Sequence, residues 1–528
     1  MNVKNRMMTI GVAAAVLALV PLAGAGAAPG GANWTNAGGD YRNTRFQASE
    51  SKLTVSNVSG LAQKWAFTTG GDVSATPAVF DGNVYVPDWS GNLYAINAKT
   101  GAQEWKASIP AASGVPFDKV RATPTVTDSL VIVGTQGSIL VPGGAPGGQV
   151  LAFSRATGQL VWRTQADSNP SAIISQSPTV FNGRVYVGVA SQEEALAAFV
   201  PGYQLTFRGS MLALDLATGA IVWKTYMAPT GYTGNAVWGS SPAIDTKRNQ
   251  VLIATGNNYS VPQSVLDCVS AAGDDGPAQA ACLPADDHFD SIMALDMTTG
   301  AVKWATRAIP YDAWTVDCIP FFGDGDLCPD PAGPDYDFGQ APALFTIKAV
   351  GGKSADVVGA GQKSGQYWVL DAATGAVRWV TQAGPGGTAG GLQWGSAVDD
   401  SRVYTADANS NFVPWTLPDG AVTTAGVWTG LDADTGQILW QTTPPHGGGA
   451  SGPVTTANGI VFGCSLDPQG YMYALNGATG QVLWQFASGG SCLSGAAISN
   501  GTVYWGSGYS NFGFGTPNNK VYAFGLQS

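Results

Sequence analysis

A motif that recurs seven times constrains the fold of this chain more than any other feature. Each copy reads Thr-Gly, any three residues, then Trp, and follows a short apolar strand; the tryptophans are Trp105, Trp162, Trp223, Trp304, Trp379, Trp440 and Trp484. The Gly supplies the positive φ of a tight hairpin, and the Trp starts the returning strand with a large ring to bury. Such a repeated unit indicates stacked blades or an array.

The two ends of the chain supply the halves of an eighth copy. Trp65 resembles the other tryptophans but has no strand and turn before it, whereas Val521-Tyr522-Ala523-Phe524 copies the strand and then stops. Joining these halves closes a ring and removes exposed sheet edges. The sequence therefore predicts an all-β, eight-bladed β-propeller whose terminal strands share one blade. An open β-solenoid or several sandwiches is the alternative.

Composition supports this fold and excludes some partners. The chain is 45% hydrophobic and only 12% charged, with 71 glycines, which suits many short strands and turns. The net charge is -11 and no run of Lys or Arg occurs, so nucleic acid and anionic membranes are poor partners.

The first residues are typical of a secretory signal peptide. Lys4 and Arg6 precede an apolar stretch and then small residues, which predicts a signal peptide over 1–27 and one propeller domain over 28–528. The apolar stretch is too short for a confident membrane span, and no other segment approaches that length. We expect a periplasmic or secreted protein without a membrane span.

Six cysteines fit that compartment. We expect the disulfides Cys268–Cys282, Cys318–Cys328 and Cys464–Cys492, although six cysteines allow fifteen pairings. A zinc site is the alternative, but the spacing is wrong and the chain has only two histidines.

Two long insertions interrupt the repeats, near 261–289 and 312–337. Both are too polar to be strands, and loops at one face of a propeller carry its function, so we expect them to cap the central funnel. Residues just before the Ser/Thr-Pro or Gly-Ser elements that open the blades should line the axial channel: Arg121, Gln176, Trp238, Gln340 and Trp394.

Four further segments carry polar or aromatic residues in a distinctive order. They are 188–194, with Glu193 and Glu194; 235–239, with Trp238; 251–257, ending in Thr-Gly-Asn at Asn257; and 361–365, with Lys363. With the repeats, they resemble the pyrroloquinoline quinone (PQQ) dehydrogenases, the eight-bladed quinoprotein alcohol dehydrogenases, and among them the polyvinyl alcohol dehydrogenase branch. The resemblance runs from about Trp34 to the C-terminus.

The resemblance implies roles for these residues. Asn257 and Glu193 are metal ligands, with Glu194 as the rival of Glu193. Trp238 is the floor under the PQQ ring, Lys363 lies beside the quinone oxygens, and Arg121 pairs with a PQQ carboxylate. We add Gln176 and Trp394 to the cofactor site because they are expected to line the channel.

The catalytic base is assigned by the same resemblance. Asp312-Ala313-Trp314 is similar to the family's Asp-x-Trp signature, but Thr315 stands where the base should follow. Asp335-Tyr336-Asp337 matches the family's Asp-Tyr-Asp pattern before Pro-x-Leu, which makes Asp335 the base and also a metal ligand, and Asp337 an extra ligand. Asp317 is the alternative base.

The sequence also departs from the family. It has no adjacent Cys-Cys pair and no Cys-x-x-Cys-His haem motif, so we expect another cover for PQQ and an external electron acceptor such as cytochrome c. The oxygen ligands favour Ca²⁺, and Asp337 permits a lanthanide.

These features predict PQQ-dependent oxidation of alcohols, including secondary or polymeric ones such as polyvinyl alcohol, to carbonyls. The alternative is a non-catalytic propeller that acts as a binding or assembly scaffold in the cell envelope. A hydrolase or lyase is disfavoured, because His288 and His446 alone are available and no Gly-x-Ser-x-Gly motif occurs. The glycine run after His446 indicates either close approach to a ligand or a flexible loop.

Overall fold

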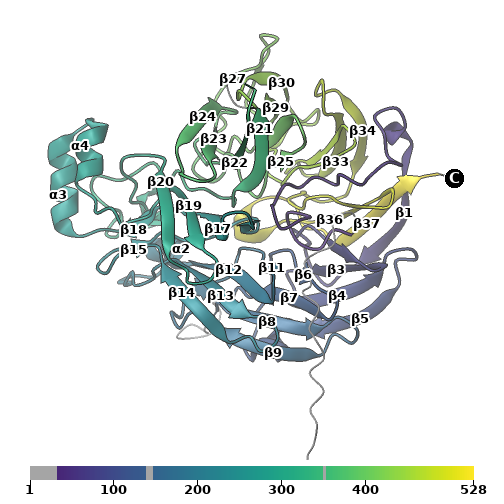
Figure 1. Ribbon diagram of the computed structural model, residues 1–528, viewed down its shortest axis with the longest axis horizontal. Coiled ribbons are helices and arrows are strands. Elements are labelled where there is room, and N and C mark those ends of the chain that lie inside the picture. The colour runs from purple at the N-terminus through teal and green to yellow at the C-terminus, as the bar shows by residue number, and fades with distance from the viewer. Residues whose placement is uncertain (1–32, 138–146, 349–351, 528) are drawn as a thin grey trace, which may run out of the picture.

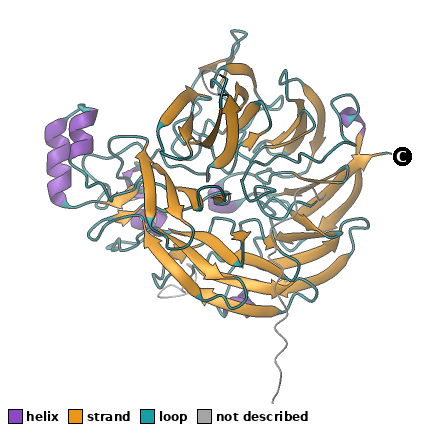
Figure 2. Ribbon diagram, viewed as in Figure 1, coloured by secondary structure: helices purple, strands orange, loops and turns teal. Residues whose placement is uncertain are grey.

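A computed structural model describes residues 33–137, 147–348 and 352–527, so the predicted signal peptide lies outside the described residues. Eight antiparallel sheets are arranged around a central axis (Figures 1 and 2). The predicted eight-bladed β-propeller is confirmed.

Each blade has four main strands, innermost first. In chain order the first four blades are β2–β5 (Ala78–Phe80, Asn83–Pro87, Asn92–Asn97, Gln103–Ser108), β6–β9 (Thr125–Val126, Leu130–Gly134, Gln149–Ser154, Leu160–Gln165), β11–β14 (Thr179–Phe181, Arg184–Ser191, Ser210–Asp215, Ile221–Tyr226, with β10, Ala172–Ile173, also on β12) and β16, β17, β19, β20 (Ala243–Asp245, Gln250–Ala254, Ser291–Asp296, Val302–Arg307). The others are β21–β24 (Ala343–Lys348, Ser354–Gly361, Gln366–Asp371, Val377–Gln382), β25, β26, β29, β30 (Ala397–Val398, Arg402–Asp407, Val427–Asp432, Ile438–Thr442), β31–β34 (Thr455–Ala457, Ile460–Cys464, Tyr471–Asn476, Val482–Ala487) and β35, β36, β37, β1 (Ala497–Ser499, Thr502–Ser507, Lys520–Leu526, Leu61–Thr68).

The repeated tryptophans join each blade to the next. The indole N–H of Trp223 donates to the carbonyl of Met297 at 3.0 Å, in the hairpin turn of the following blade. Gly300 in that turn has a φ of 74°, and a Cβ there would lie 2.6 Å from the Trp223 ring. The motif therefore needs its Gly for close packing as well as for backbone conformation.

The last blade closes the ring as predicted. Strand β1 pairs with β37, with Trp65 opposite Ala523. The indole of Trp484 donates to the carbonyl of Leu61 at 2.9 Å, so the seventh repeat docks on the N-terminal strand.

Residues 34–47, here called the N-terminal arc, run around the hub and contact the innermost strand of every blade. Their backbone hydrogen bonds reach Val79, Val126, Ile244, Leu344, Val398 and Thr456. Tyr41 packs against Phe181 at 5.4 Å, and the Gln47 amide donates to the carbonyl of Ile498, which adds the remaining two blades. The sequence motifs gave no indication of this arc.

The remaining elements are short. The helices are α1 (Ile109–Ser113), α2 (Glu193–Phe199), α3 (Gln263–Ala272) and α4 (Gly276–Ala281), and the 3-10 turns are η1 (Val58–Gly60), η2 (Val316–Cys318) and η3 (Asn511–Gly513). Two small sheets have two strands each: β15 (Thr233–Gly234) pairs with β18 (Asn258–Ser260), and β27 (Trp415–Thr416) pairs with β28 (Val422–Thr423). In the described part of the chain no helix is both long and apolar enough to cross a bilayer.

The three expected disulfides are present: Cys268–Cys282, Cys318–Cys328 and Cys464–Cys492. The first joins α3 to the residue that follows α4. Figure 1 shows these two helices at the outer edge of the ring, so the helical part of the first insertion does not cover the hub as expected. The second disulfide closes a loop beside α2.

Candidate functional site

The candidate residues come from loops at one face of the ring. Asn257 follows β17, Lys363 follows β22, and Glu193 and Glu194 begin α2 after β12. Trp238 precedes β16, and Asp335 and Asp337 precede β21. The propeller thus brings together residues from separate blades.

Asn257 presents a buried oxygen that lacks a donor. Its Nδ2 donates to the carbonyls of Asn258 (2.9 Å) and Trp314 (2.8 Å), which fixes the amide orientation. Its Oδ1 is buried, and no donor among the described residues reaches it. Because buried acceptors are normally paired, this oxygen fits a bound cation.

Asp337 holds the ends of two strands together. Its Oδ1 accepts the backbone N–H of Asn257 at 2.6 Å, and its carbonyl accepts the N–H of Lys363 at 2.9 Å. A Cβ on Gly256 would lie 2.7 Å from the Asp337 carboxylate, so the Gly of Thr-Gly-Asn makes room for that carboxylate.

Asp335 is buried and ion-paired. The Lys363 Nζ lies 2.7 Å from Asp335 Oδ1 and 3.3 Å from Asp337 Oδ2. Asp335 has a φ of 59°, a conformation that costs a non-Gly residue about 1–3 kcal/mol and is typical of functional sites. Burial raises the pKa of Asp335, nearby carboxylates raise it further, and Lys363 opposes both.

The two neighbouring glutamates are used differently. Glu193 Oε2 accepts the backbone N–H groups of Thr206 and Phe207, both at 2.8 Å, and its Oε1 accepts the Thr206 hydroxyl and the Asn169 amide. Its carboxylate therefore holds the α2–β13 loop. Both oxygens of Glu193 are therefore already hydrogen bonded within the protein, which disfavours the ligand role expected for it.

Glu194 instead faces the acidic cluster. No described donor hydrogen bonds to its carboxylate. Burial raises its pKa to about 7; Lys363 opposes this shift, and the carboxylates of Asp337 and Asp312 add to it. Of the two glutamates, Glu194 is the one whose carboxylate accepts no hydrogen bond from a described residue.

Asp290 and Asp312 join this cluster, although sequence reasoning did not assign them to the site. Burial raises the pKa of Asp312 to about 6, and burial and the neighbouring Asp312 raise that of Asp290 well above its usual range. Asp312 also accepts the N–H groups of Asp335 and Tyr336, which shapes the loop that carries Asp335. Asp290 directly precedes β19, and that position was its only sequence signal.

The ammonium of Lys363 thus interacts with the carboxylates of Asp335, Asp337 and Glu194, and Asp290 and Asp312 extend the acidic cluster beside them. Across the described ranges, no three His, Cys, Asp or Glu side chains converge as a ready-made metal cluster. A cation here would be held by the Asn257 amide together with carboxylates, and would relieve their mutual repulsion.

An aromatic and cationic wall faces the acidic cluster. Lys363 Nζ lies 5.6 Å from the centre of the Trp238 ring, and Trp238 meets Trp394 edge to face at 5.4 Å. Arg121 stacks on Trp394 at 4.3 Å and lies 5.5 Å from the Trp89 ring. These groups suit a flat anionic ring system: indoles stack on its faces and guanidinium binds its carboxylates.

Three other sequence candidates lie differently. Gln176 is fully buried, accepts the N–H of Gly188 at 2.8 Å and donates to the carbonyl of Gly239 at 3.5 Å, so its amide links two backbone segments. Asp317, the alternative base, accepts the N–H groups of Gly325 and Leu327, so both of its carboxylate oxygens are hydrogen bonded within the disulfide loop. His446 stacks on Tyr471 at 3.7 Å.

Comparisons with known proteins agree with this geometry. A family model described as outer membrane protein assembly factor BamB matches residues 51–306 and 364–528. A polyvinylalcohol dehydrogenase from Sphingopyxis sp. (strain 113P3) is 30% identical to this chain, over 91% of this chain's length and 73% of the relative's length. The quinoprotein alcohol dehydrogenase PedH from Pseudomonas putida is 24% identical over 84% of this chain and 80% of its own.

Solved structures show the same fold. The quinohemoprotein alcohol dehydrogenase from Comamonas testosteroni has a TM-score of 0.68 at 20% identity, covering 94% of this chain and 80% of its own. A europium-containing methanol dehydrogenase has the same TM-score at 18% identity, covering 94% and 98%. With this sequence similarity and this site, the chain belongs to the PQQ-dependent (quinoprotein) alcohol dehydrogenases, an enzyme family of oxidoreductases that includes the polyvinyl alcohol dehydrogenases.

Proposed function

We propose that this protein oxidises alcohols to carbonyls with PQQ and a metal ion bound at the hub. The observation that carries the proposal is the buried Oδ1 of Asn257, which no donor among the described residues reaches, beside the Asp335–Lys363 ion pair and the surrounding carboxylates. Bound PQQ supplies an electrophilic quinone that accepts hydride.

The proposed metal ligands are Glu194, Asn257, Asp335 and Asp337. All are oxygen donors, which suits Ca²⁺ or a lanthanide ion and disfavours softer metals. We propose Glu194 in place of Glu193, because the oxygens of Glu193 are already hydrogen bonded within the protein.

Asp335 is the proposed base that takes the hydroxyl proton of the alcohol. Burial raises the pKa of Asp335, Lys363 opposes that rise, and the neighbouring acids add to it. A neighbouring cation lowers the pKa of a carboxylate and keeps it ionised at neutral pH. We therefore expect the metal to be required for a competent base as well as for the quinone.

Trp238, Trp394 and Arg121 are the proposed binding groups for PQQ, and Lys363 the cation beside its reactive oxygens. We propose secondary or polymeric alcohols as substrates, because the 30%-identical relatives are polyvinylalcohol dehydrogenases. An external carrier such as cytochrome c would accept the electrons in the periplasm or outside the cell.

The test uses metal-stripped, cofactor-free protein. PQQ is added with Ca²⁺ or with La³⁺, and reduction of an artificial dye is followed with primary, secondary and polymeric alcohols. We expect dye reduction only when PQQ, metal and alcohol are all present. If PQQ and metal together support no alcohol-dependent reduction with any of the three alcohol classes, the proposal fails.

The match to the BamB family model favours one second candidate, a non-catalytic assembly scaffold. A scaffold has no use for a buried Asp335–Lys363 pair inside a cluster of five acids. Without a bound cation, such a cluster of buried charges destabilises the fold. Failure of the protein to bind either PQQ or metal would favour the scaffold.

A further inference from the structure

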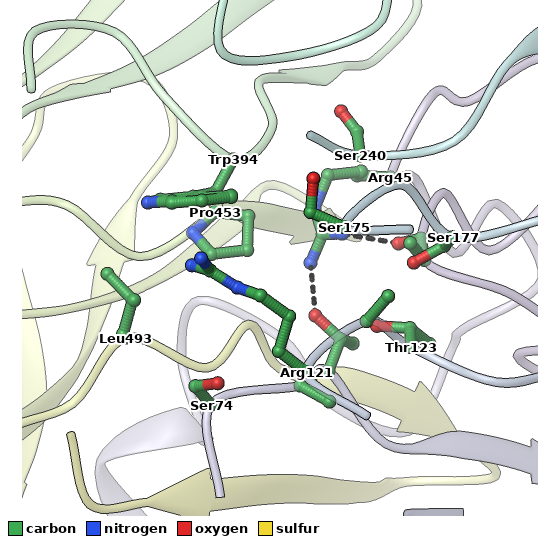
Figure 3. Close-up of a pocket in the computed structure, with 14 residues that line it drawn as sticks. Arg45, Ser74, Arg121, Thr123, Ser175, Ser177, Ser240, Trp394, Pro453 and Leu493 are labelled. Atoms are coloured by element: carbon green, nitrogen blue, oxygen red, sulfur yellow. Dashed lines mark hydrogen bonds between the residues drawn. The ribbon is translucent and has the colours of Figure 1, made fainter. Parts of the chain in front are cut away.

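A cleft with a volume of about 450 Å³ lies between the first two blades, away from the hub. Its walls come from β3, β4 and β5 of the first blade and from the β6–β7 and β8–β9 turns of the second. Both turns lie on the face opposite the loops that carry the candidate site, because successive strands of a blade are antiparallel. No described residue lines both this cleft and the hub pocket, where Arg121 and Trp394 lie (Figure 3). The volume of the cleft is in the range of small-ligand sites.

The cleft opens where the repeated hairpin departs from its own pattern. The residue before the repeated Trp is Glu104 here, whereas the other six copies have Val161, Val222, Lys303, Arg378, Leu439 and Leu483. The second copy ends its strand with Ser154, where the others have Asp or Asn, and continues with Arg155, where the others have Ala, Leu, Met or Gly. Three residues that are exceptions among the repeats therefore line the same cleft.

Arg155 fixes one wall of the cleft. Its Nε donates to the carbonyl of Asp128 at 2.8 Å, and its Nη1 pairs with Asp81 at 3.2 Å. The guanidinium also lies 4.9 Å from the centre of the Phe80 ring. These contacts hold the β8–β9 turn against the first blade, so the charged group keeps one position at the edge of the cleft.

Two aromatic side chains form another part of the lining, and one of them has an unusual hydroxyl. The hydroxyls of Tyr186 and Tyr504 donate to a backbone carbonyl in the hairpin turn of the next blade, at 3.4 and 3.2 Å. Tyr85 has the same place in its own blade but donates to no carbonyl of a described residue, and its hydroxyl interacts with Arg155 instead. The Trp105 ring packs at 5.9 Å from the Tyr85 ring.

The remaining lining groups are polar and largely unpaired. Glu104 Oε1 accepts the Asn97 amide at 3.0 Å, and no described donor reaches its Oε2. The carboxylate of Asp128 and the hydroxyls of Ser129 and Ser154 likewise have no hydrogen-bond partner among the described residues. The cleft thus offers carboxylate acceptors, hydroxyls that can donate or accept, and a guanidinium donor.

This mixture of groups selects for an uncharged, polar ligand. An anion would be repelled by Glu104 and Asp128, and a cation would be repelled by Arg155. An apolar ligand would leave the polar groups without partners, at a cost of about 1–3 kcal/mol for each buried group. A neutral ligand with many hydroxyl groups can donate to the carboxylates, accept from the guanidinium and place its C–H groups against the indole.

We propose that this cleft binds a neutral chain that carries many hydroxyl groups. Glu104, Asp128 and Arg155 supply its hydrogen bonds, and Trp105 supplies the apolar contact. Oligosaccharides and polymeric alcohols both have this chemistry. The proposal does not rest on the proposed function, because none of the residues assigned to PQQ, metal or proton transfer lines the cleft.

The experiment measures, by calorimetry, binding of a maltooligosaccharide and separately of a short polyvinyl alcohol to the protein, with no PQQ or metal added. The test variant is Glu104→Val/Arg155→Ala, which introduces residue types that other repeats hold at these positions and therefore suits the fold. The matched control is Lys303→Val/Arg378→Val, which changes the residue before the repeated Trp in two blades outside the cleft. Circular dichroism checks that both variants fold.

We expect wild type and control to bind at least one of the two chains, and the test variant to bind that chain about tenfold more weakly or worse. Binding of the saccharide alone identifies a saccharide site, and binding of the polyvinyl alcohol alone identifies a site for polymeric alcohols. The proposal is overturned if neither chain binds to wild type, or if the test variant binds as wild type does. It is also overturned if the control loses as much affinity as the test variant.

A second variant keeps the test decisive if Glu104→Val/Arg155→Ala does not fold. Asp128→Asn changes one carboxylate oxygen at an exposed turn position. Weaker binding of the chain by this variant supports the proposal, and unchanged binding overturns it. Because no PQQ or metal is added, failure of the proposed function would leave these results unaffected.

Discussion

Replacing Glu193 and Glu194 by glutamine, one at a time, separates a structural carboxylate from a ligand carboxylate. Both oxygens of Glu193 accept hydrogen bonds, two of them from the backbone N–H groups of Thr206 and Phe207. A glutamine has one oxygen, so its amide N–H₂ must face at least one buried donor in either orientation. Leaving buried donors unpaired, and losing a charged acceptor, should cost about 3 kcal/mol of unfolding free energy.

Glu194→Gln should act in the opposite way. Its carboxylate has no described donor and is repelled by Asp337 and Asp312, so the metal-free variant should be as stable as wild type or more stable. Removing one charged oxygen ligand should weaken metal binding about tenfold or more.

The assay has two measurements for each variant. Urea unfolding of the metal-free protein gives the change in unfolding free energy, and a luminescence titration with Tb³⁺, together with calorimetry with Ca²⁺, gives metal affinity. The reasoning is refuted if Glu193→Gln lowers metal affinity at unchanged stability while Glu194→Gln leaves metal affinity intact.

Three further predictions concern the base, the repeat and pH. Asp335→Asn should keep PQQ binding, measured by fluorescence quenching, and lose most alcohol-dependent dye reduction; full activity would remove Asp335 as the base. Gly300→Ala should lower the unfolding free energy by about 2 kcal/mol or more, because of its positive φ and the Trp223 ring, and an unchanged urea midpoint would contradict this. Burial raises the pKa values of Glu194 and Asp407 to about 7. The contribution of these two carboxyl groups to stability is fully present below about pH 4 and is lost as pH rises through 7. The loss of metal-free stability between pH 5 and pH 8 should therefore be smaller in Glu194→Gln than in wild type, and an equal loss would count against the assignment.

The sequence was sufficient to predict the ring because its pattern is local and repeated. Each Thr-Gly and Trp marks one turn and one returning strand, and the split copy at Trp65 and Phe524 identifies the closing blade. The N-terminal arc could not be predicted in this way. Its contacts are single backbone hydrogen bonds to distant strands, and these leave no pattern in the residues that make them.

A site residue could be predicted where a motif fixes its position, but not where either of two adjacent residues could fill the same role. Thr-Gly-Asn places Asn257, and Asp-Tyr-Asp places Asp335. Glu193 and Glu194 are one residue apart, and which of them faces the hub depends on where α2 begins and on the donors at Thr206 and Phe207.

Other parts of the site depend on the packing of several blades. Gln176 precedes a blade opening, as Trp238 and Trp394 do, but its amide is used between strands. Asp290 lies in no motif at all, because its role arises only when loops from different blades meet at the axis.

The most direct test of the account is a crystal structure of the protein loaded with PQQ and a lanthanide, in which anomalous scattering locates the metal. We predict one metal peak at about 2.3–2.6 Å from Asn257 Oδ1 and from the carboxylates of Glu194 and Asp335, with PQQ stacked on Trp238. A metal peak outside this cluster, or PQQ bound away from Trp238, would contradict the central claim.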